Sequence, residues 1–176
     1  MEKGIIILLN GVSSSGKTTL SKAIQDTMQE PYFLMGNDLF FEMLPDRFCQ
    51  ADWMEAEYQA LHMMGRTARL FSDAGKHVII DAVLLSVQKN DPYAAIQNAL
   101  AGCPVCLVHV VCPAEVLRRR ERERKDRDIG QAEGQLSLLY PKDGYDLIID
   151  THSNTPQECA AQICQWVMSR YPHKII

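Results

Sequence analysis

Short apolar runs alternate along the chain with longer segments in which apolar side chains recur every three to four residues. Runs rich in β-branched and aliphatic residues are typical of strands buried on both faces of a parallel sheet. The longer segments are typical of amphipathic helices. The predicted strands are residues 5–9, 32–35, 77–81, 105–111 and 146–150. The predicted helices are residues 17–30, 38–44, 52–74, 87–101, 113–125, 131–138 and 155–170.

Helix boundaries are marked by residues that stop or cap a helix. Pro31 disfavours helical geometry in the residue before it and so ends the first helix. Gly75 fits the end of the helix that begins near residue 52. Thr155 and Glu158 have the spacing of a capping box at the start of the last helix.

Strands that alternate with helices predict an α/β fold with a five-stranded parallel sheet and helices on both faces. No repeat, low-complexity tract or Gly/Ser linker interrupts the 176 residues, so we expect a single domain over residues 1–176. Ligands of such sheets bind beyond the carboxyl ends of the strands. The polar segments at these ends are residues 10–19, 36–38, 81, 112–113 and 150–152.

The segment after the first strand matches G-x-x-x-x-G-K-[ST] at every fixed position. Its residues are Gly11, Val12, Ser13, Ser14, Ser15, Gly16, Lys17 and Thr18. This pattern, between a strand and a helix, predicts a P-loop nucleoside-triphosphate hydrolase or kinase fold that binds a nucleotide. The motif alone does not distinguish a kinase from a GTPase or an ATP-driven machine. Backbone N–H groups of the loop would hold phosphates, with Lys17 at the β- and γ-phosphates and Thr18 on Mg²⁺. Thr19 is placed to contact the α-phosphate. A Ser/Gly-rich turn that carries a lysine by chance is the alternative.

Two aspartates at strand ends are candidates for chemistry. Asp81 ends an apolar strand and is suited to hold Mg²⁺, or else it caps the next segment. Asp38 follows the second strand, where a carboxylate can accept the proton of an acceptor hydroxyl. The alternative is that Asp38 is only the N-cap of the following helix.

A cluster of arginines lies within a predicted lid region at about residues 118–138. Arg120 is placed to stack on adenine or approach the phosphates. Arg124 and Arg127 are three residues apart before Ile129-Gly130 and could stabilise charge on the transferred phosphoryl group. The alternative is a solvated helix face, because four acidic residues interleave with the arginines. These are Glu115, Glu121, Glu123 and Asp126.

Charge and composition exclude several classes of protein. The formal net charge is −4, without the basic surplus of a nucleic-acid binder. No segment has the length of a signal peptide's apolar core or of a membrane helix, so we expect a cytoplasmic protein with no membrane partner. The six cysteines are then expected to be reduced and structural, including the Cys103–Cys106 pair with its CxxC spacing.

Five stretches together resemble the chloramphenicol phosphotransferase-like family of P-loop kinases. They are IIILLNGVSSSGKTTL, MGNDLFFEMLP, AGKHVIIDAVLL, RERKDRDIG and YDLIIDTHSNTPQECA. The resemblance implies that Asp38 is the catalytic base and that Arg124 and Arg127 are lid arginines, while Lys17 and Thr18 keep their P-loop roles. The activity that it implies is ATP-dependent 3-O-phosphorylation of chloramphenicol, which inactivates the antibiotic.

Several functions stay open at this point. The favoured one is transfer of the γ-phosphoryl group of ATP to a hydroxyl of a small molecule. Kinases of a nucleoside, sugar or other metabolite use the same machinery, and a regulatory ATPase or a protein-binding module with a vestigial loop are further alternatives. No N-K-x-D motif indicates a GTPase. Oligomeric state and the acceptor are not determined, although a homo-oligomer is common for such proteins. The expected acceptor cleft is flanked by Phe40, Phe41, Met43, Leu44, Met54, Tyr58, Leu84 and Leu85.

Overall fold

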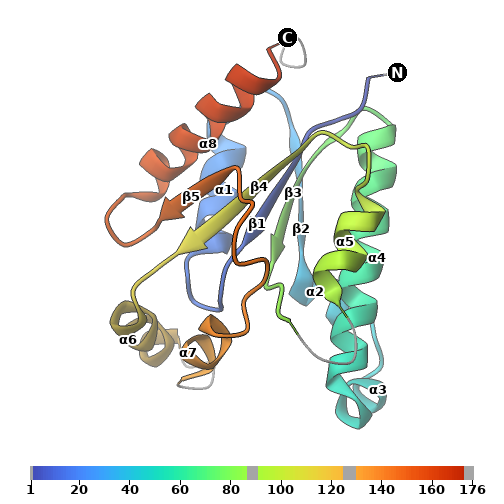
Figure 1. Cartoon of the computed structure of the whole chain (residues 1–176), viewed down its shortest axis with the longest axis vertical. Helices are drawn as coiled ribbons and strands as arrows, with labels where there is room; N and C mark the ends of the chain where they lie inside the picture. The colour runs from blue at the N-terminus through green and yellow to red at the C-terminus, as the bar shows by residue number, and fades with distance from the viewer. Residues whose placement is uncertain (1, 87–90, 125–129, 173–176) are drawn as a thin grey trace.

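A parallel five-stranded sheet runs through the centre of the chain (Figure 1). The computed structural model describes residues 2–86, 91–124 and 130–172. The strand order is β2-β3-β1-β4-β5, so the strand that precedes the P-loop is central. The strands are β1 (Ile6–Asn10), β2 (Tyr32–Gly36), β3 (His77–Ala82), β4 (Val105–Val111) and β5 (Leu147–Asp150). All neighbouring pairs are parallel, which confirms the predicted α/β P-loop fold.

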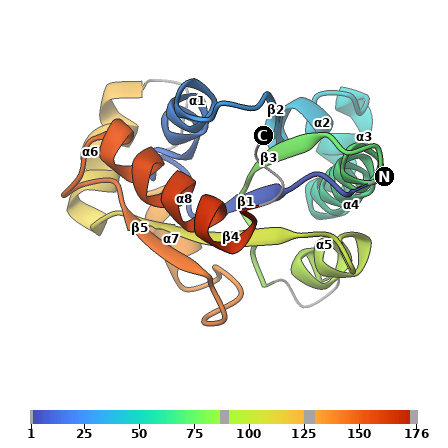
Figure 2. The ribbon, with the colours of Figure 1, turned by 90° about the horizontal axis from the view of Figure 1, so that it is seen from above.

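Helices cover both faces of this sheet (Figures 1 and 2). Helices α1 (Lys17–Thr27) and α8 (Pro156–Arg170) pack together on one face, and α4 (Trp53–Asp73) and α5 (Pro92–Ala99) on the other. Helices α2 (Asn37–Phe41), α6 (Ala114–Arg124) and α7 (Gln131–Leu136) lie at the end of the sheet where the strand arrowheads point (Figure 1). Helix α3 (Asp46–Ala51) precedes α4.

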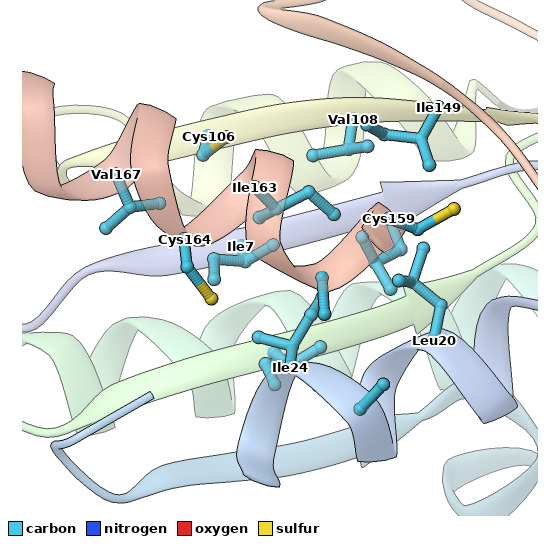
Figure 3. Close-up of a cluster of buried hydrophobic side chains, with 14 of the residues drawn as sticks. Ile7, Leu20, Ile24, Cys106, Val108, Ile149, Cys159, Ile163, Cys164 and Val167 are labelled. Atoms are coloured by element: carbon cyan, nitrogen blue, oxygen red, sulfur yellow. The ribbon is translucent and has the colours of Figure 1, made fainter. Parts of the chain in front are cut away.

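Alternate side chains of the central strand enter two separate hydrophobic clusters. Ile5, Ile7 and Leu9 contribute to the cluster under α1 and α8, which also contains Ile24 and Ile163 (Figure 3). Ile6 and Leu8 face the opposite way and join the cluster under α4 and α5. This two-residue period explains why the strand reads as continuously apolar: both of its faces are buried.

The cysteine side chains act mainly as core residues. Cys106, Cys159 and Cys164 are buried in the α1–α8 cluster, where Figure 3 shows them among aliphatic side chains. All six thiols are free. Burial raises the pKa of Cys164 to about 11, so this thiol stays protonated and unreactive near neutral pH.

Most predicted helix boundaries hold to within three residues, but one predicted helix differs more. The helix predicted over residues 87–101 begins at Pro92, with Asp91 as its N-cap, and residues 87–90 lie outside the described part of the chain. Gly75 has a φ of 74° after α4, and Thr155 with Glu158 forms the predicted capping box of α8. The first helix ends at Thr27 instead of residue 30. The helix predicted over residues 38–44 ends at Phe41, and a separate helix, α3, follows Pro45 because proline starts a new helix more readily than it continues one.

Within the described residues, no helix combines the length and the hydropathy that a membrane span requires.

Asn10, the last residue of β1, anchors the loops around the site. Its side chain is fully buried and donates to the Tyr140 carbonyl and to the Tyr145 hydroxyl, both at 2.9 Å. Its Oδ1 accepts the Leu84 N–H at 2.9 Å. One amide therefore fixes both the segment after β3 and the segment after α7.

We expect Asn10→Ala to lower the free energy of unfolding by about 2–3 kcal/mol, because it leaves buried polar groups without partners. Urea denaturation measures this change. The matched control is Asn98→Ala on the exposed side of α5, where the free energy should change by no more than about 0.5 kcal/mol. Equal effects of the two substitutions would show that the Asn10 bonds contribute little to stability.

Candidate active site

The register of the sheet brings three strand ends to one level. Leu9 of β1 pairs with Asp81 of β3, and Asp81 pairs with Gly36 of β2. The P-loop leaves β1 directly after this level, and Asp38 follows Gly36 by two residues. Segments far apart in sequence therefore converge at the carboxyl edge of the sheet, as the α/β topology predicts.

The P-loop is held in a conformation that only certain residues allow. A Cβ added to Gly11 would lie 2.5 Å from the Val110 carbonyl oxygen, so the loop begins in direct contact with β4. Gly16 has a φ of 94° and Ser14 a φ of 59°, both in the left-handed region. The hydroxyls of Ser14 and Ser15 are buried without a hydrogen-bond partner among the described residues. Such donors fit a loop built to receive an anion.

Lys17, Thr18 and Asp81 form one polar cluster at the start of α1. The Lys17 side chain is buried, donates to the Val12 carbonyl at 3.0 Å and lies 3.8 Å from Asp81 Oδ1. The Thr18 hydroxyl donates to Asp81 Oδ2 at 2.7 Å. Asp81 thus faces the phosphate loop instead of capping the next segment. Thr18 and Asp81 supply the hard oxygen ligands that Mg²⁺ prefers.

A large cleft of about 940 Å³ joins this cluster to Asp38. The predicted P-loop residues Ser13, Ser14, Gly16, Lys17, Thr18 and Thr19 line it together with Asp38 and Asp81. Asp38 is exposed and lies in the first turn of α2, whose cap position is Gly36 and not Asp38. The interpretation of Asp38 as an N-cap is therefore wrong, and the residue lines the cleft.

A second hollow, of about 330 Å³, shares Ser14, Gly16 and Thr19 with the cleft and is also lined by the predicted Arg120. The Arg120 guanidinium donates to the Ser14 carbonyl at 3.3 Å, to Thr151 Oγ1 at 3.2 Å and to the Thr151 carbonyl at 2.9 Å. Thr151 in turn donates to the Ser15 carbonyl at 2.6 Å. Arg120 thus links the P-loop to the end of β5 and lines this hollow with Asn154 and Pro156.

Helices α6 and α7 fold over the P-loop. Glu121, expected on a solvated face, is instead buried and accepts the N–H groups of Gly130 at 2.8 Å and Ala132 at 2.7 Å. Its carboxylate replaces the side-chain cap that Gly130 cannot give α7. Gln135 Oε1 accepts the Ser13 N–H at 2.8 Å, so α7 touches the loop directly.

Of the two predicted lid arginines, Arg124 and Arg127, the structure describes only the backbone of Arg124. Arg124 is the last residue of α6, and its side chain lies outside the described part of the chain. Arg127 also lies outside the described residues. Their predicted role in charge stabilisation stays a prediction. Arg118 forms a two-bond pair with Glu133, at 2.8 and 2.6 Å, which ties α6 to α7.

Sequence reasoning missed Glu57, a half-buried carboxyl group on α4 that lines the cleft. The Asn37 side-chain amide donates to Glu57 Oε1 at 2.6 Å. Burial raises the pKa of Glu57 to about 7, the Asn37 hydrogen bond acts against this, and the negative charge of Asp38 adds to it. A signal was present: Glu57 continues the buried stripe of Leu61, Met64 and Ala68 by one helical turn, where an apolar residue is expected.

The apolar residues predicted for an acceptor pocket fall into separate groups. Phe41 and Leu85 line the large cleft, and Met54 and Tyr58 line a small apolar hollow beside it. Leu84 is instead fully buried and Phe40 packs against the same core cluster. Met43 and Leu44 line neither hollow. Trp53, which no sequence pattern singled out, lines both and is 56% exposed.

Comparison with known proteins decides the family. Residues 4–168 match the family described as "Chloramphenicol phosphotransferase-like protein". A protein of Mycobacterium tuberculosis (strain ATCC 25618 / H37Rv) named "Putative O-phosphotransferase Rv2636" is 30% identical over 93% of this chain and 82% of its own length. The chain belongs to the chloramphenicol phosphotransferase-like family. The predicted resemblance is confirmed.

Solved structures of low sequence identity share the fold. The M. tuberculosis APS kinase CysC in complex with AMPPNP and APS has a TM-score of 0.73 at 16% identity, covering 95% of this chain and 99% of that one. A sugar kinase from Janibacter sp. HTCC2649 has a TM-score of 0.72 at 20% identity, covering 94% of each chain. With the family membership, this supports a kinase-type phosphotransferase with a nucleotide-binding P-loop.

The raised pKa of Glu57 predicts a pH-dependent stability. In the unfolded chain the group loses its proton near pH 4.5, and in the folded chain near pH 7. The folded state binds more protons between these values, so the free energy of unfolding should fall as pH rises from 4.5 to 7 and level off above. Glu57→Gln should remove this contribution, which is at most about 3 kcal/mol.

Urea denaturation of both proteins from pH 4.5 to 8 measures the difference. Glu55→Gln, on the same helix but outside the cleft, is the control. Its free energy of unfolding should depend on pH in the same way as that of the unchanged protein. Parallel pH profiles for the unchanged chain and Glu57→Gln would contradict the raised pKa.

Proposed function

We propose that this chain is an ATP- and Mg²⁺-dependent O-phosphotransferase that moves the γ-phosphoryl group to a hydroxyl of a small organic molecule. One observation carries the proposal: a single cleft joins the P-loop, the Thr18–Asp81 pair and the carboxylate of Asp38. A nucleotide switch or regulatory ATPase does not need a carboxylate that faces an acceptor, so this arrangement favours a kinase.

The phosphate side of the cleft accounts for nucleotide binding. Backbone N–H groups from Gly16 to Thr18, at the N-terminus of α1, would attract phosphate oxygens. Lys17 adds a buried positive charge where negative charge accumulates in the transferred group. The hollow beside Arg120 and Thr151 adjoins the cleft at Gly16 and suits the adenosine part of ATP.

Thr18 and Asp81 would hold Mg²⁺ at this site. Both supply oxygen atoms, and their 2.7 Å hydrogen bond shows that they reach the same point beside Lys17. A bound Mg²⁺ neutralises charge on the phosphate oxygens. Few protein ligands are required, because Mg²⁺ keeps several waters and also binds the substrate phosphates.

Asp38 provides the general base. Its carboxylate accepts the proton of the acceptor hydroxyl as that oxygen bonds to the γ-phosphorus and the bond to the β-phosphate breaks. The products are ADP, the phosphorylated acceptor and a proton on Asp38. Positioning contributes as well, because transfer requires the entering and leaving oxygens to lie in line. Arg124 and Arg127 are proposed to stabilise the transferred charge.

The acceptor is a small alcohol, for which chloramphenicol is the first compound to test. The name of the family supports this choice, and the cleft has an aromatic wall at Trp53 and Phe41 that suits a ring. A sugar, nucleoside or other metabolite is the second candidate, which the likeness in fold to a sugar kinase supports.

We expect Asp38→Asn to lower acceptor-dependent turnover by about 10²–10⁴-fold while the affinity for ATP stays within about threefold, because only the proton acceptor is lost. The measurement is ADP release with a panel of aromatic alcohols, amino alcohols, sugars and nucleosides. Asp46→Asn, an exposed aspartate at the start of α3, should leave turnover unchanged. Undiminished turnover in Asp38→Asn removes the base role, and no ADP release with any acceptor refutes the proposed activity.

Lys17→Ala should weaken ATP binding and catalysis together, with turnover at saturating acceptor reduced at least about 100-fold. The reason is that the buried ammonium group contacts the phosphates in both the ground state and the transition state. Calorimetric titration with AMPPNP and single-turnover assays measure the two effects. The control is Lys22→Ala, an exposed lysine of the same helix. An unchanged affinity would place the phosphates away from Lys17.

A further inference from the structure

The cleft is charged differently on its two sides. The phosphate side carries Lys17, which is its one cationic lining residue within the part of the chain that the structure describes. The acceptor side, formed by Asn37, Asp38, Leu39, Trp53, Glu57 and Leu85, carries two carboxyl groups and no described cation. Among the described residues, these two carboxyl groups would repel an anionic acceptor, and no described arginine or lysine on this side offsets that repulsion.

Asn37 and Glu57 form a hydrogen-bonded pair beside Asp38, the proposed base. Asn37 is buried, and its amide donates to Glu57 Oε1 at 2.6 Å. This bond links α2, which carries Asp38, to α4. It therefore holds the Glu57 carboxyl group close enough to Asp38 for the two charges to interact. A helix residue that only filled the core would not keep a carboxyl group at the edge of a cleft.

The polar atoms of the acceptor side are mostly hydrogen-bond acceptors. Both carboxylates accept, and a carboxylate has room for several bonds on its two oxygens. Asn37 Oδ1 is a further buried acceptor without a partner among the described residues. The ligand group that complements such a surface is one that only donates. An ammonium group has three donors, no acceptor and a positive charge.

Apolar side chains lie next to these hydrogen-bond-accepting groups. Trp53 lines the cleft and the small apolar hollow that Met54, Tyr58 and Leu61 also line. A cation near the face of an exposed tryptophan is favoured, and a ring beside it buries apolar surface. The acceptor side thus combines a negative site with an aromatic one.

We propose that Glu57 is the specificity-determining residue of the acceptor site and that it selects aromatic alcohols carrying an ammonium group over neutral and anionic ones. This rests on the proposed phosphotransferase function and narrows its acceptor. The ammonium group binds at Glu57 while the hydroxyl group faces Asp38. The proposed acceptor site therefore differs from a site for an anionic ligand, such as the APS in the CysC structure of similar fold.

Affinity should depend on pH through the ionisation of Glu57. The pKa of this group is raised to about 7, so it gains its full negative charge only above neutral pH. The charged groups that share the cleft with it are Asp38 from α2, Asp81 from β3 and Lys17 from α1, and Tyr58 lies on its own helix. Binding of an ammonium compound should therefore strengthen as pH rises from 6 to 8.

The test compares three ligands of the same ring and chain length. They are 2-amino-3-phenylpropan-1-ol, its N-acetyl derivative and 3-phenyllactate, which are cationic, neutral and anionic. Calorimetric titration with and without Mg²⁺ and AMPPNP measures binding of each. We expect the cationic alcohol to bind about tenfold more tightly than the neutral one, with the anionic one weakest. Glu57→Gln should reduce this preference to about twofold or less and abolish the rise with pH.

Glu55→Gln is the matched control on the same helix and should keep both the preference and its pH dependence. Equal affinities, a preference for the neutral or anionic ligand, or no binding of the cationic alcohol up to about 10 mM would overturn the inference. A preference that survives in Glu57→Gln would remove Glu57 from this role.

ADP release measured with the same ligands separates this inference from the proposed function. Binding that depends on Glu57 without ADP release from any acceptor leaves the inference standing and refutes phosphoryl transfer. ADP release with chloramphenicol or sugars, but without a preference for ammonium compounds, supports phosphoryl transfer and refutes the inference about Glu57.

Discussion

The parallel register of β2, β3 and β1 is the constraint on which the whole site depends. It sets Gly36, Asp81 and Leu9 at one level, so the residues that follow them meet at one edge of the sheet. Asp81 points to the α1 face because its neighbours Ile80 and Ala82 enter the opposite cluster. If β3 were shifted by one residue relative to β1, the Asp81 carboxylate would point away from Thr18 and an apolar side chain would take its place. The buried clusters on both faces exclude such a slip.

Contacts with β4, β5 and α7 fix the conformation of the P-loop. The loop is pressed against β4 at Gly11, tied to β5 through Thr151 and Arg120, and touched from α7 by Gln135. Its backbone N–H groups are therefore oriented before any phosphate arrives, which lowers the ordering cost of binding. Helix α7 keeps its position because the buried Glu121 carboxylate fixes its first turn. Helices α6 and α7, the end of β5 and the P-loop are thus linked by hydrogen bonds.

Charge divides the cleft into two functional halves. Lys17 lies on the side of the P-loop, whereas Asp38 and Glu57 place two carboxyl groups on the opposite side. In the proposed reaction, the phosphoryl group would move from the lysine side toward the carboxyl side, so its charge would be neutralised where it starts. Burial and the negative charge of Asp38 raise the pKa of Glu57, so binding of a cationic acceptor, as proposed, would be accompanied by release of a proton from Glu57.

The sequence by itself determined the fold, the family and the position of the phosphate loop, because these depend on short-range patterns. Apolar runs define strands buried on both faces, and eight consecutive residues from Gly11 to Thr18 carry the anion-binding geometry. Asp38 and Asp81 were also found, since their place at strand ends follows from topology. Only the tertiary structure decided that Glu121 is buried under α7 and that Glu57 lies beside Asp38. Both carboxyl groups act through contacts between distant segments. Nothing local distinguishes Glu121 from a solvated glutamate, and the buried stripe of α4 marks the position of Glu57 as unusual without indicating its neighbours.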